Sequence, residues 1–342
     1  MKNLFRISIF EFSNSQPFRA PATPGERLMN KFFHRSKWHF LGFLVLVLAT
    51  VPVWGSKYMV FFCLLFCVYL AMSQMWNLLT GFSGLFSLGQ PAFIGLGGYT
   101  VAVATHHFGL SAWTSVALAG LLSVIFALFM SLFIFRVRGI YYGIITLIFP
   151  EAMLLLCSNW EYLRYAQGMF IKPQPPISVT AIYYMAFVIG VGAVASVYLI
   201  LRSNLGLGLM AMRDNEEVAN TMGVETFRFK VYCFMVSGLV TGLAGAIYYN
   251  FMVFIQPHEA FSIGWSVKFI FITIIGGIGT MEGPIVGALI YVFLSQYLAE
   301  YFSVSMIMLG AIAITVILLT PKGIVGTFQK KIGFRILSPH RE

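Results

Sequence analysis

The chain has 342 residues, of which 59% are hydrophobic and only 10% are charged, and its formal net charge is +10. This composition excludes an ordinary soluble domain, because it provides many apolar segments long enough to cross a hydrocarbon core of about 30 Å. The sequence therefore predicts an all-α, polytopic transmembrane helix bundle. The four cysteines lie in or beside apolar segments without metal-ligand spacing, which favours buried thiols over a disulfide or a metal site.

Residues 1–37 are expected to form a basic cytoplasmic tail. They contain seven Lys and Arg residues, and Arg6, Glu11, Asn14 and Pro17 interrupt their apolar stretches. A cleavable signal peptide needs an uninterrupted apolar stretch of about 7 to 15 residues, so we do not expect one here. The tail orients the protein, and its basic and aromatic residues suit the lipid headgroup zone.

Apolar runs predict about ten spans in a membrane domain of residues 38–321. They cover residues 38–55, 58–79, 85–105, 112–135, 139–157, 179–201, 231–254, 265–279, 284–299 and 304–320. Two places are expected to be irregular, since the third span contains Pro91 among several Gly and Ser residues, and residues 276–287 suit either two helices or one broken or re-entrant element. Such backbone at membrane depth needs cover from protein or a water-filled cavity.

The distribution of basic residues predicts the orientation of these spans. Of the 22 Lys and Arg residues, an amino terminus in the cytoplasm leaves only four outside, Lys57, Arg164, Lys172 and Lys268. Because basic residues concentrate on the cytoplasmic side of membrane proteins, we predict that both termini are inside, with residues 322–342 as a second basic tail. This rule also accounts for the positive charge without a nucleic-acid partner.

Two glycine-dense stretches are candidates for a solute path. Residues 81–99 read GFSGLFSLGQPAFIGLGGY, and residues 276–287 read GGIGTMEGPIVG. An interrupted helix frees backbone groups that a polar solute can meet. The candidate path residues are Ser87, Gly89, Gln90, Gly276 and Gly277. The alternative is close helix contact through small residues, which is common in membranes.

Glu151 is a further candidate for the path. It follows Pro150 and is the one carboxylate that the ten-span interpretation places deep in a span. Intramembrane acids are costly and usually face a cavity or a partner, which favours a functional role. A shifted span boundary would instead bring Glu151 near the interface. Both interpretations stay open, and a proton-carrying Glu151 would indicate an ion-coupled transporter.

A polar stretch between two long apolar runs predicts a docking element. Residues 212–230 read MRDNEEVANTMGVETFRFK, inside an inner loop of residues 202–230. Four of the chain's twelve acidic residues are here, namely Asp214, Glu216, Glu217 and Glu225. We expect a short helix with an acidic face, an apolar face and a glycine stop. The residues expected to form and cap it are Arg213, Asp214, Asn215, Glu216, Glu217, Val218, Ala219, Met222 and Gly223, with Asp214 or Asn215 as the cap.

The chain contains no motif for catalysis or nucleotide binding. It lacks a recognisable Ser or Cys triad, an H-E-x-x-H zinc motif and a G-x-x-x-x-G-K-[ST] phosphate loop. We therefore expect no enzyme activity, cofactor or metal in this chain. If ATP and Mg drive it, separate subunits must bind them.

Several stretches together resemble the permease family of branched-chain amino-acid ABC importers, in particular its LivM-like branch. They occur in family order between residues 81 and 326. The matching stretches are SGLFSLGQPAFIGLGGYT (83–100), RVRGIYYGIITLIFPEA (136–152), NLGLGLMAMRDNEEVANTMGVETFRFK (204–230), FMVSGLVTGLAGAIY (234–248), GGIGTMEGPIVGA (276–288) and PKGIVG (321–326).

This resemblance implies a permease domain in a bacterial-type inner membrane. It implies three kinds of partner, namely a second, LivH-like permease, two cytoplasmic ATPases and an extracytoplasmic solute-binding protein. Residues 213–223 look like the coupling helix that rests on an ATPase. One departure concerns residues 159–169, NWEYLRYAQGM, where the family often carries a T-G-G-S-D-G-type stretch. The solute is expected to be a branched-chain or related amino acid, with urea or a short amide as the alternative.

Overall fold

The computed structural model describes residues 45–137, 139–298 and 323–332, together with positions 42, 308, 310–312, 314, 315, 318 and 320. The chain separates into two compact units, Met1–Leu46 and Val47–Glu342. The description below concerns the second unit, which holds nearly all of the described residues.

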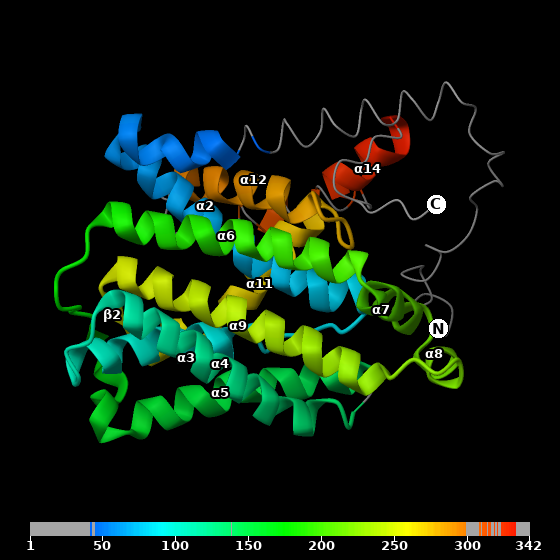
Figure 1. The fold of residues 1–342 in the computed structure, drawn as a ribbon, viewed down its shortest axis with the longest axis horizontal. Helices are drawn as coiled ribbons and strands as arrows, with labels where there is room; N and C mark the ends of the chain where they lie inside the picture. The colour runs from blue at the N-terminus through cyan, green and yellow to red at the C-terminus, as the bar shows by residue number, and fades with distance from the viewer. Residues whose placement is uncertain are drawn as a thin grey trace. The chain divides into compact units, whose positions relative to one another are not determined.

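The second unit is a bundle of long apolar helices (Figure 1). Six described segments are long and apolar enough to cross a membrane: Lys57–Phe82, Ala112–Ile134 (α4), Tyr141–Asn159 within α5 (Ile140–Asn159), Val179–Arg202 (α6), Thr226–Met252 (α9) and Pro257–Gly276. Shorter helices are α3 (Gln90–His106), α12 (Gly283–Leu298), α14 (Gly323–Ile332) and the helix Val45–Trp54, whose first two residues belong to the first unit. This architecture confirms the predicted all-α membrane bundle.

Two of the six spanning segments are composite. Segment Lys57–Phe82 consists of α2 (Lys57–Asn77) and a π-helical turn, η1 (Leu78–Phe82). Segment Pro257–Gly276 consists of α10 (Pro257–Ala260) and α11 (Gly264–Gly276). The predicted span 304–320 lies outside the described residues apart from isolated positions.

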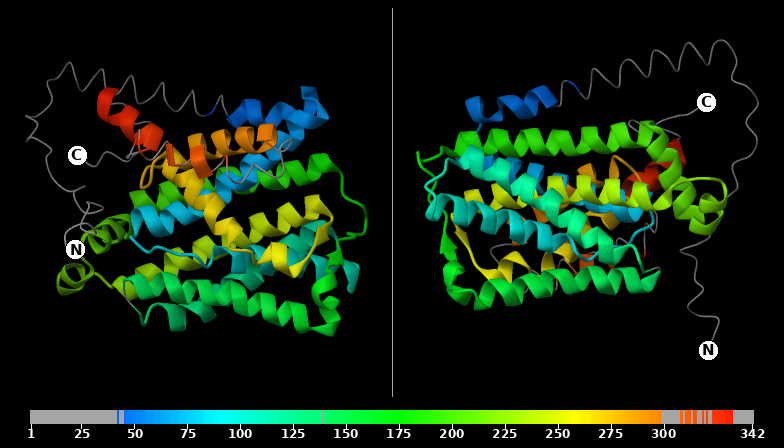
Figure 2. Two further views of the ribbon diagram at one scale, coloured as in Figure 1. Left: turned by 180° about the vertical axis from the view of Figure 1, so that it is seen from behind. Right: turned by 60° about the horizontal axis from the view of Figure 1, so that its bottom comes forward.

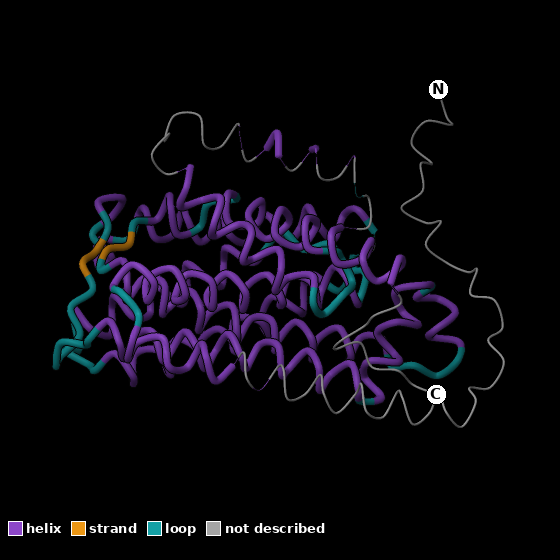
Figure 3. Tube along the Cα trace, turned by 90° about the horizontal axis from the view of Figure 1, so that it is seen from above, coloured by secondary structure: helices purple, strands orange, loops and turns teal. Residues whose placement is uncertain are grey.

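Small elements mark the two ends of the bundle. At one end, β1 (Met169–Phe170) pairs antiparallel with β2 (Phe254–Ile255), and Met169 faces Ile255 in the register. The short helices η2 (Glu161–Leu163) and η3 (Tyr165–Gln167) precede this pair. At the other end lie α7 (Asn204–Asp214) and α8 (Glu216–Thr221), and Figure 3 shows the two ends well separated.

Serine caps start three of the long helices. Ser56, Ser111 and Ser178 each accept a hydrogen bond from the backbone N–H three residues later, at the beginning of α2, α4 and α6. A serine hydroxyl at this position satisfies one of the four N–H groups that a helix start leaves without a partner. These caps fix where three apolar runs of the sequence begin as helices.

Small residues allow α9 to run through the middle of the bundle, against α2, α3, α4 and α6 (Figures 1 and 2). A Cβ at Gly97 of α3 would collide with the carbonyl of Gly242 of α9, and a Cβ at Gly245 would lie 2.6 Å from the carbonyl oxygen of Ile94. Since lipid offers little hydrophobic drive for helix association, such backbone contact holds membrane helices together. The packing role considered for the first glycine-dense stretch is therefore observed.

Candidate functional site

The inner loop predicted at residues 202–230, called here the polar segment, forms two helices instead of one. α7 follows α6 after a break at Ser203, and α8 follows α7 after the single residue Asn215. α9 begins at Thr226, five residues before its predicted start, so Arg228 and Lys230 belong to a helix. Both α7 and α8 lie at the end of the bundle opposite to β2 (Figure 1).

Asn215 caps α8. Its side-chain Oδ1 accepts hydrogen bonds from the backbone N–H groups of Glu217, at 3.0 Å, and Val218, at 3.2 Å. Glu216 and Glu217 occupy the first turn, where negative charge is favourable next to the free N–H groups of a helix. Of the two caps that the sequence allowed, Asn215 is the cap and Asp214 is the last residue of α7.

α8 ends at the glycine that the sequence predicted. The N–H of Val224 bonds to the carbonyl of Ala219, and the N–H of Gly223 bonds to the carbonyl of Asn220, both at 3.0 Å. This pair of bonds is a Schellman motif, which requires a left-handed residue at the position of Gly223. Gly223 has a φ of 84°. Both ends of α8 are thus fixed by local hydrogen bonds.

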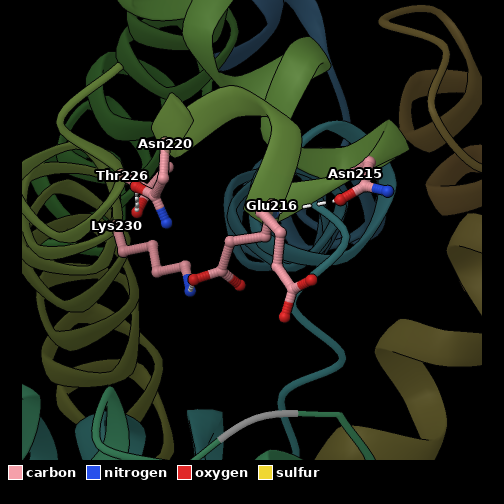
Figure 4. A network of polar contacts seen from close by, with 6 residues as sticks. Asn215, Glu216, Asn220, Thr226 and Lys230 are labelled. Carbon is pink, nitrogen blue, oxygen red and sulfur yellow. Dashed lines mark hydrogen bonds and ion pairs between the residues drawn. The ribbon is translucent and has the colours of Figure 1, made fainter. Parts of the chain in front are cut away.

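Two side-chain contacts hold α8 on the first turns of α9 (Figure 4). Glu216 Oε1 lies 2.5 Å from Lys230 Nζ, and the Thr226 hydroxyl donates to Asn220 Oδ1 over 2.8 Å. The Lys230 side chain is only 7% exposed and that of Glu216 is 29% exposed. The ion pair is therefore partly shielded from water. Charge attraction at such a shielded site is stronger than at an open surface.

The predicted apolar face of α8 is divided between inside and outside. Ala219 is buried, 3% exposed, whereas Val218 is half exposed and Met222 is 80% exposed. Residues four apart lie on the same side of a helix, which explains why Val218 and Met222 point outward together. Glu217 is exposed as well. The outer surface of α8 therefore combines a carboxylate with a prominent methionine.

Two hollows lie at the polar segment. One has a volume of about 410 Å³ and the other about 450 Å³. The first is lined by Asn204, Leu207, Gly208, Ala211, Gly223, Val224, Glu225 and Phe229. The second is lined by Phe135, Glu216, Asn220, Glu225, Thr226, Phe227, Arg228 and Lys230. The first hollow thus lies between α7 and the residues that follow α8, and the second lies between α8 and the first turns of α9.

The first group of candidate path residues lies buried at the start of α3. Ser87 and Gln90 are each 1% exposed. The Gln90 amide donates to Ser237 Oγ over 2.9 Å and accepts from Thr241 Oγ1 over 2.8 Å, both on α9. A Cβ at Gly89 would lie 2.8 Å from the carbonyl oxygen of Thr146 on α5. These residues join α3 to its neighbours, and their part in a solute path stays a prediction.

Glu151 lies on the outer face of α5, away from the interior of the chain. It is exposed, as are Ile144, Ile148 and Leu155 on the same side of the helix. The neighbouring Pro150 is buried inside the helix. Because an ionised carboxylate in hydrocarbon is costly, this face needs cover from another protein or access to water.

Gly276 and Gly277 lie where α11 breaks before α12, at the same end as the polar segment. A Cβ at Gly276 would collide with the carbonyl of Gly283, and Gly277 is the C-cap of α11 with a φ of 126°. The break is a loop of six residues, 277–282, held to α2 by hydrogen bonds from Gln74 and Asn77. Reading the sequence missed these two polar residues, although each interrupts a long apolar run.

Comparison with known proteins identifies the family. Residues 58–319 match the family described as Branched-chain amino acid transport system / permease component. The chain is 26% identical to the high-affinity branched-chain amino acid transport system permease protein LivM of Salmonella typhimurium, over 95% of this chain and 81% of the relative. Identity to LivM of Escherichia coli is also 26%, over 90% and 78% of the two chains.

Less extensive matches include a second kind of permease. The probable branched-chain amino acid transport permease protein LivH of Methanocaldococcus jannaschii is 26% identical over 46% of this chain and 51% of its own. No solved structure matches significantly. These relatives are transport permeases, which confirms the prediction of a transport subunit without enzyme activity. The chain belongs to the family of branched-chain amino acid transport system permease components, the membrane-spanning subunits of ABC importers.

Proposed function

We propose that this chain forms half of the solute path of an importer for branched-chain or related amino acids, and that two cytoplasmic ATPases drive it through α8. The second half of the path is a LivH-like permease, and an extracytoplasmic binding protein delivers the solute. The chain crosses a bacterial inner membrane about ten times, with both tails, residues 1–37 and 322–342, in the cytoplasm. The ATPases bind ATP and Mg.

The form of α8 is the observation that carries this proposal. A subunit that receives force needs a rigid element at its surface, and α8 is capped by Asn215, closed by Gly223 and held to α9 by Glu216. Its outer side offers Met222 as an apolar anchor and Glu217 as a charge. Exposed apolar anchors surrounded by charge are typical of docking surfaces.

Charge on the polar segment suggests the chemistry of the ATPase surface. Asp214 and Glu217 are exposed around α8, whereas the exposed Glu225 pairs with Arg228 over 2.6 Å. A basic rim on the ATPase would therefore speed association and set the register of docking. Arg213 lies among these residues, but its side chain turns toward the bundle. Docking by this surface moves the permease only if the ATPase prefers one of its access states.

The outer face of α5 is the proposed contact with the solute path and the second permease. Glu151 lies on a face that membrane lipid alone would not suit, and a path between two permeases supplies both protein and water. Ser87, Gly89 and Gln90 support this path from the start of α3, while Gly276 and Gly277 give the inner end of α11 its irregular shape. An acid on the path also suits the ammonium group of an amino acid.

Two other functions compete with this proposal. Proteins similar to this chain are named for different solutes, since the L-arabinose ABC transporter permease protein AraH of Azospirillum brasilense is 24% identical over 65% of this chain. Residues 159–169 depart from the family pattern on the outer side, so a urea or short-amide importer is the first alternative. An ion-coupled transporter using Glu151 is the second.

Purification and uptake assays test the proposal. The permease is co-expressed with its candidate ATPases, LivH-like subunit and binding protein, and the complex is reconstituted into vesicles. We expect the ATPases to co-purify and uptake of leucine, isoleucine or valine to require ATP and the binding protein. A thermal-shift screen of the binding protein identifies the solute. Uptake that depends on a proton gradient and not on ATP would overturn the proposal.

A further inference from the structure

Arg213 connects the polar segment to the interior of the bundle. Its Nη1 donates a hydrogen bond to the main-chain carbonyl oxygen of Gly81 over 2.7 Å, across 132 positions of sequence. Gly81 lies in η1, the last turn of the segment Lys57–Phe82. The final carbonyls of a helix have no partner within it and carry partial negative charge, so a guanidinium is a suitable cap. Arg213 thus caps the α2–η1 helix from α7.

The same guanidinium passes beside the break between α11 and α12. A Cβ at Gly279, in loop 277–282, would lie 3.2 Å from Arg213 Nη1 and 3.2 Å from the Gly81 carbonyl oxygen. A Cβ at Gly84, just after η1, would lie 3.3 Å from Arg213 Cγ. Glycine at both positions leaves room for the arginine to reach its acceptor. The guanidinium therefore lies next to both η1 and the loop, while Arg213 as a whole stays exposed.

Loop 277–282 and α2 form one hydrogen-bonded unit. Asn77 Nδ2 donates to the Thr280 carbonyl over 2.8 Å, and Asn77 Oδ1 accepts from the Gly279 N–H over 2.9 Å. Gln74 Nε2 donates to the Met281 carbonyl over 2.8 Å. Both amide side chains are fully buried. Because unsatisfied buried polar groups are costly, the loop and α2 resist separation, and a force on one reaches the other.

We propose that Arg213 is the positioning residue that transmits movement of α8 to loop 277–282. It stands two residues before Asn215, the cap of α8, and its guanidinium bonds to Gly81 at the end of the α2–η1 helix, to which the loop is also bonded. A displacement of α8 therefore either pulls this unit along or breaks the bond to Gly81, and the two outcomes define two arrangements of the inner end of the path. The proposal rests on the proposed role of α8 as the ATPase contact.

Hydrogen exchange on the reconstituted complex, with its ATPases and binding protein, tests the connection. Backbone exchange at residues 216–223 and 277–282 is compared with and without ATP, in wild type, Arg213→Gln and Arg213→Lys. Arg136→Gln is the matched control, because it removes the same charge from an exposed position after α4 at the same end of the bundle. Solute transported per ATP hydrolysed is measured in the same vesicles.

We expect ATP to change exchange in both regions of the wild type and of Arg136→Gln. In Arg213→Gln the response at residues 216–223 should persist, whereas the response at residues 277–282 should disappear. Transport per ATP should fall at least about fivefold, the lower end of typical coupling between sites. Arg213→Lys keeps a charged donor and should recover part of both the loop response and the transport ratio.

The possible failures are distinguishable. A wild-type loop response and transport ratio in Arg213→Gln would overturn the role of Arg213 while leaving α8 as the ATPase contact. An Arg213→Lys variant no better than Arg213→Gln would also contradict capping by a charged donor. If residues 216–223 of the wild type do not respond to ATP, the proposed function of α8 itself is wrong.

Discussion

Glu216 Oε1 lies 2.5 Å from Lys230 Nζ, which ties the first residue of α8 to the second turn of α9. The adjacent Glu217 is exposed instead. Two neighbouring carboxylates, which look equivalent in the sequence, therefore have different surroundings. Glu216 holds α8 in place, and Glu217 lies on the exposed outer surface of α8.

This difference predicts that two matched substitutions affect different properties of the protein. Glu216→Gln leaves the largely buried Lys230 ammonium without its carboxylate. It should therefore lower the thermal unfolding temperature and reduce the free energy of unfolding by about 1–3 kcal/mol. Glu217→Gln should weaken ATPase binding, most clearly at low salt, where surface charges are least screened. Unfolding is followed by tryptophan fluorescence and binding by co-purification. Unchanged stability in Glu216→Gln, or unchanged ATPase binding in Glu217→Gln, would contradict the assignment.

Met222 is predicted to be an anchor for the ATPase. It is 80% exposed at the end of α8, so Met222→Ala removes little packing within the chain. Truncation of an apolar anchor at an interface typically costs more than 1 kcal/mol, and we expect ATPase affinity to fall about tenfold with no change in unfolding temperature. Met252→Ala, at the opposite end of the bundle, is the control. Unchanged affinity in Met222→Ala would remove this side chain from the interface.

Gly223 is predicted to matter through its backbone alone. Its φ is 84°, and a Cβ built there meets no atom within 4 Å. Gly223→Val should therefore strain the end of α8 by about 1–2 kcal/mol without any steric clash, whereas Gly223→Asn should be tolerated, because Asn adopts the left-handed region more readily. Solute-stimulated ATP hydrolysis and ATPase recovery are the measurements. Equal activity of the Val and Asn variants would show that the end of α8 does not need this conformation.

The sequence predicted the local features of the fold and of α8. Long apolar runs located nine described helices, and the pattern Asn215 to Gly223 located both ends of α8, because caps and glycine stops depend on neighbouring residues. The start of α9 was placed too late because Arg228 and Lys230 were taken for loop residues. A buried Lys230 is tolerated in α9 because Glu216 neutralises its charge. That contact spans fourteen positions of sequence.

Contacts between distant segments could not be predicted from the sequence. Arg213 was predicted to be an ATPase-coupling residue, which stays a prediction, and its hydrogen bond to the backbone carbonyl of Gly81 is a contact that no sequence pattern reveals. Ala219 was placed on the same face as Met222, although only Met222 points outward. In both cases the neighbouring helices decide which way a side chain turns, and their positions depend on packing across the whole bundle.

Glu151 provides the sharpest test between an ATP-driven and an ion-coupled transporter. A proton-carrying acid must exchange protons in every cycle, so Glu151→Gln would then abolish uptake or its dependence on the proton gradient. An acid that only lines or supports a path between two permeases affects how the solute passes but not the source of energy. Its exposed position on α5, a face that needs a covering partner, favours the second role.

We therefore expect Glu151→Gln to retain uptake with an altered rate or affinity. With ATP held constant, an uncoupler should leave uptake by both wild type and variant unchanged. Ile148→Gln, one turn earlier on the same exposed face, is the control for adding a polar amide at this depth. The measurement is solute uptake by reconstituted vesicles with and without an imposed proton gradient. Complete loss of uptake in Glu151→Gln alone, together with proton-gradient dependence in wild type, would favour ion coupling over the ATP-driven mechanism.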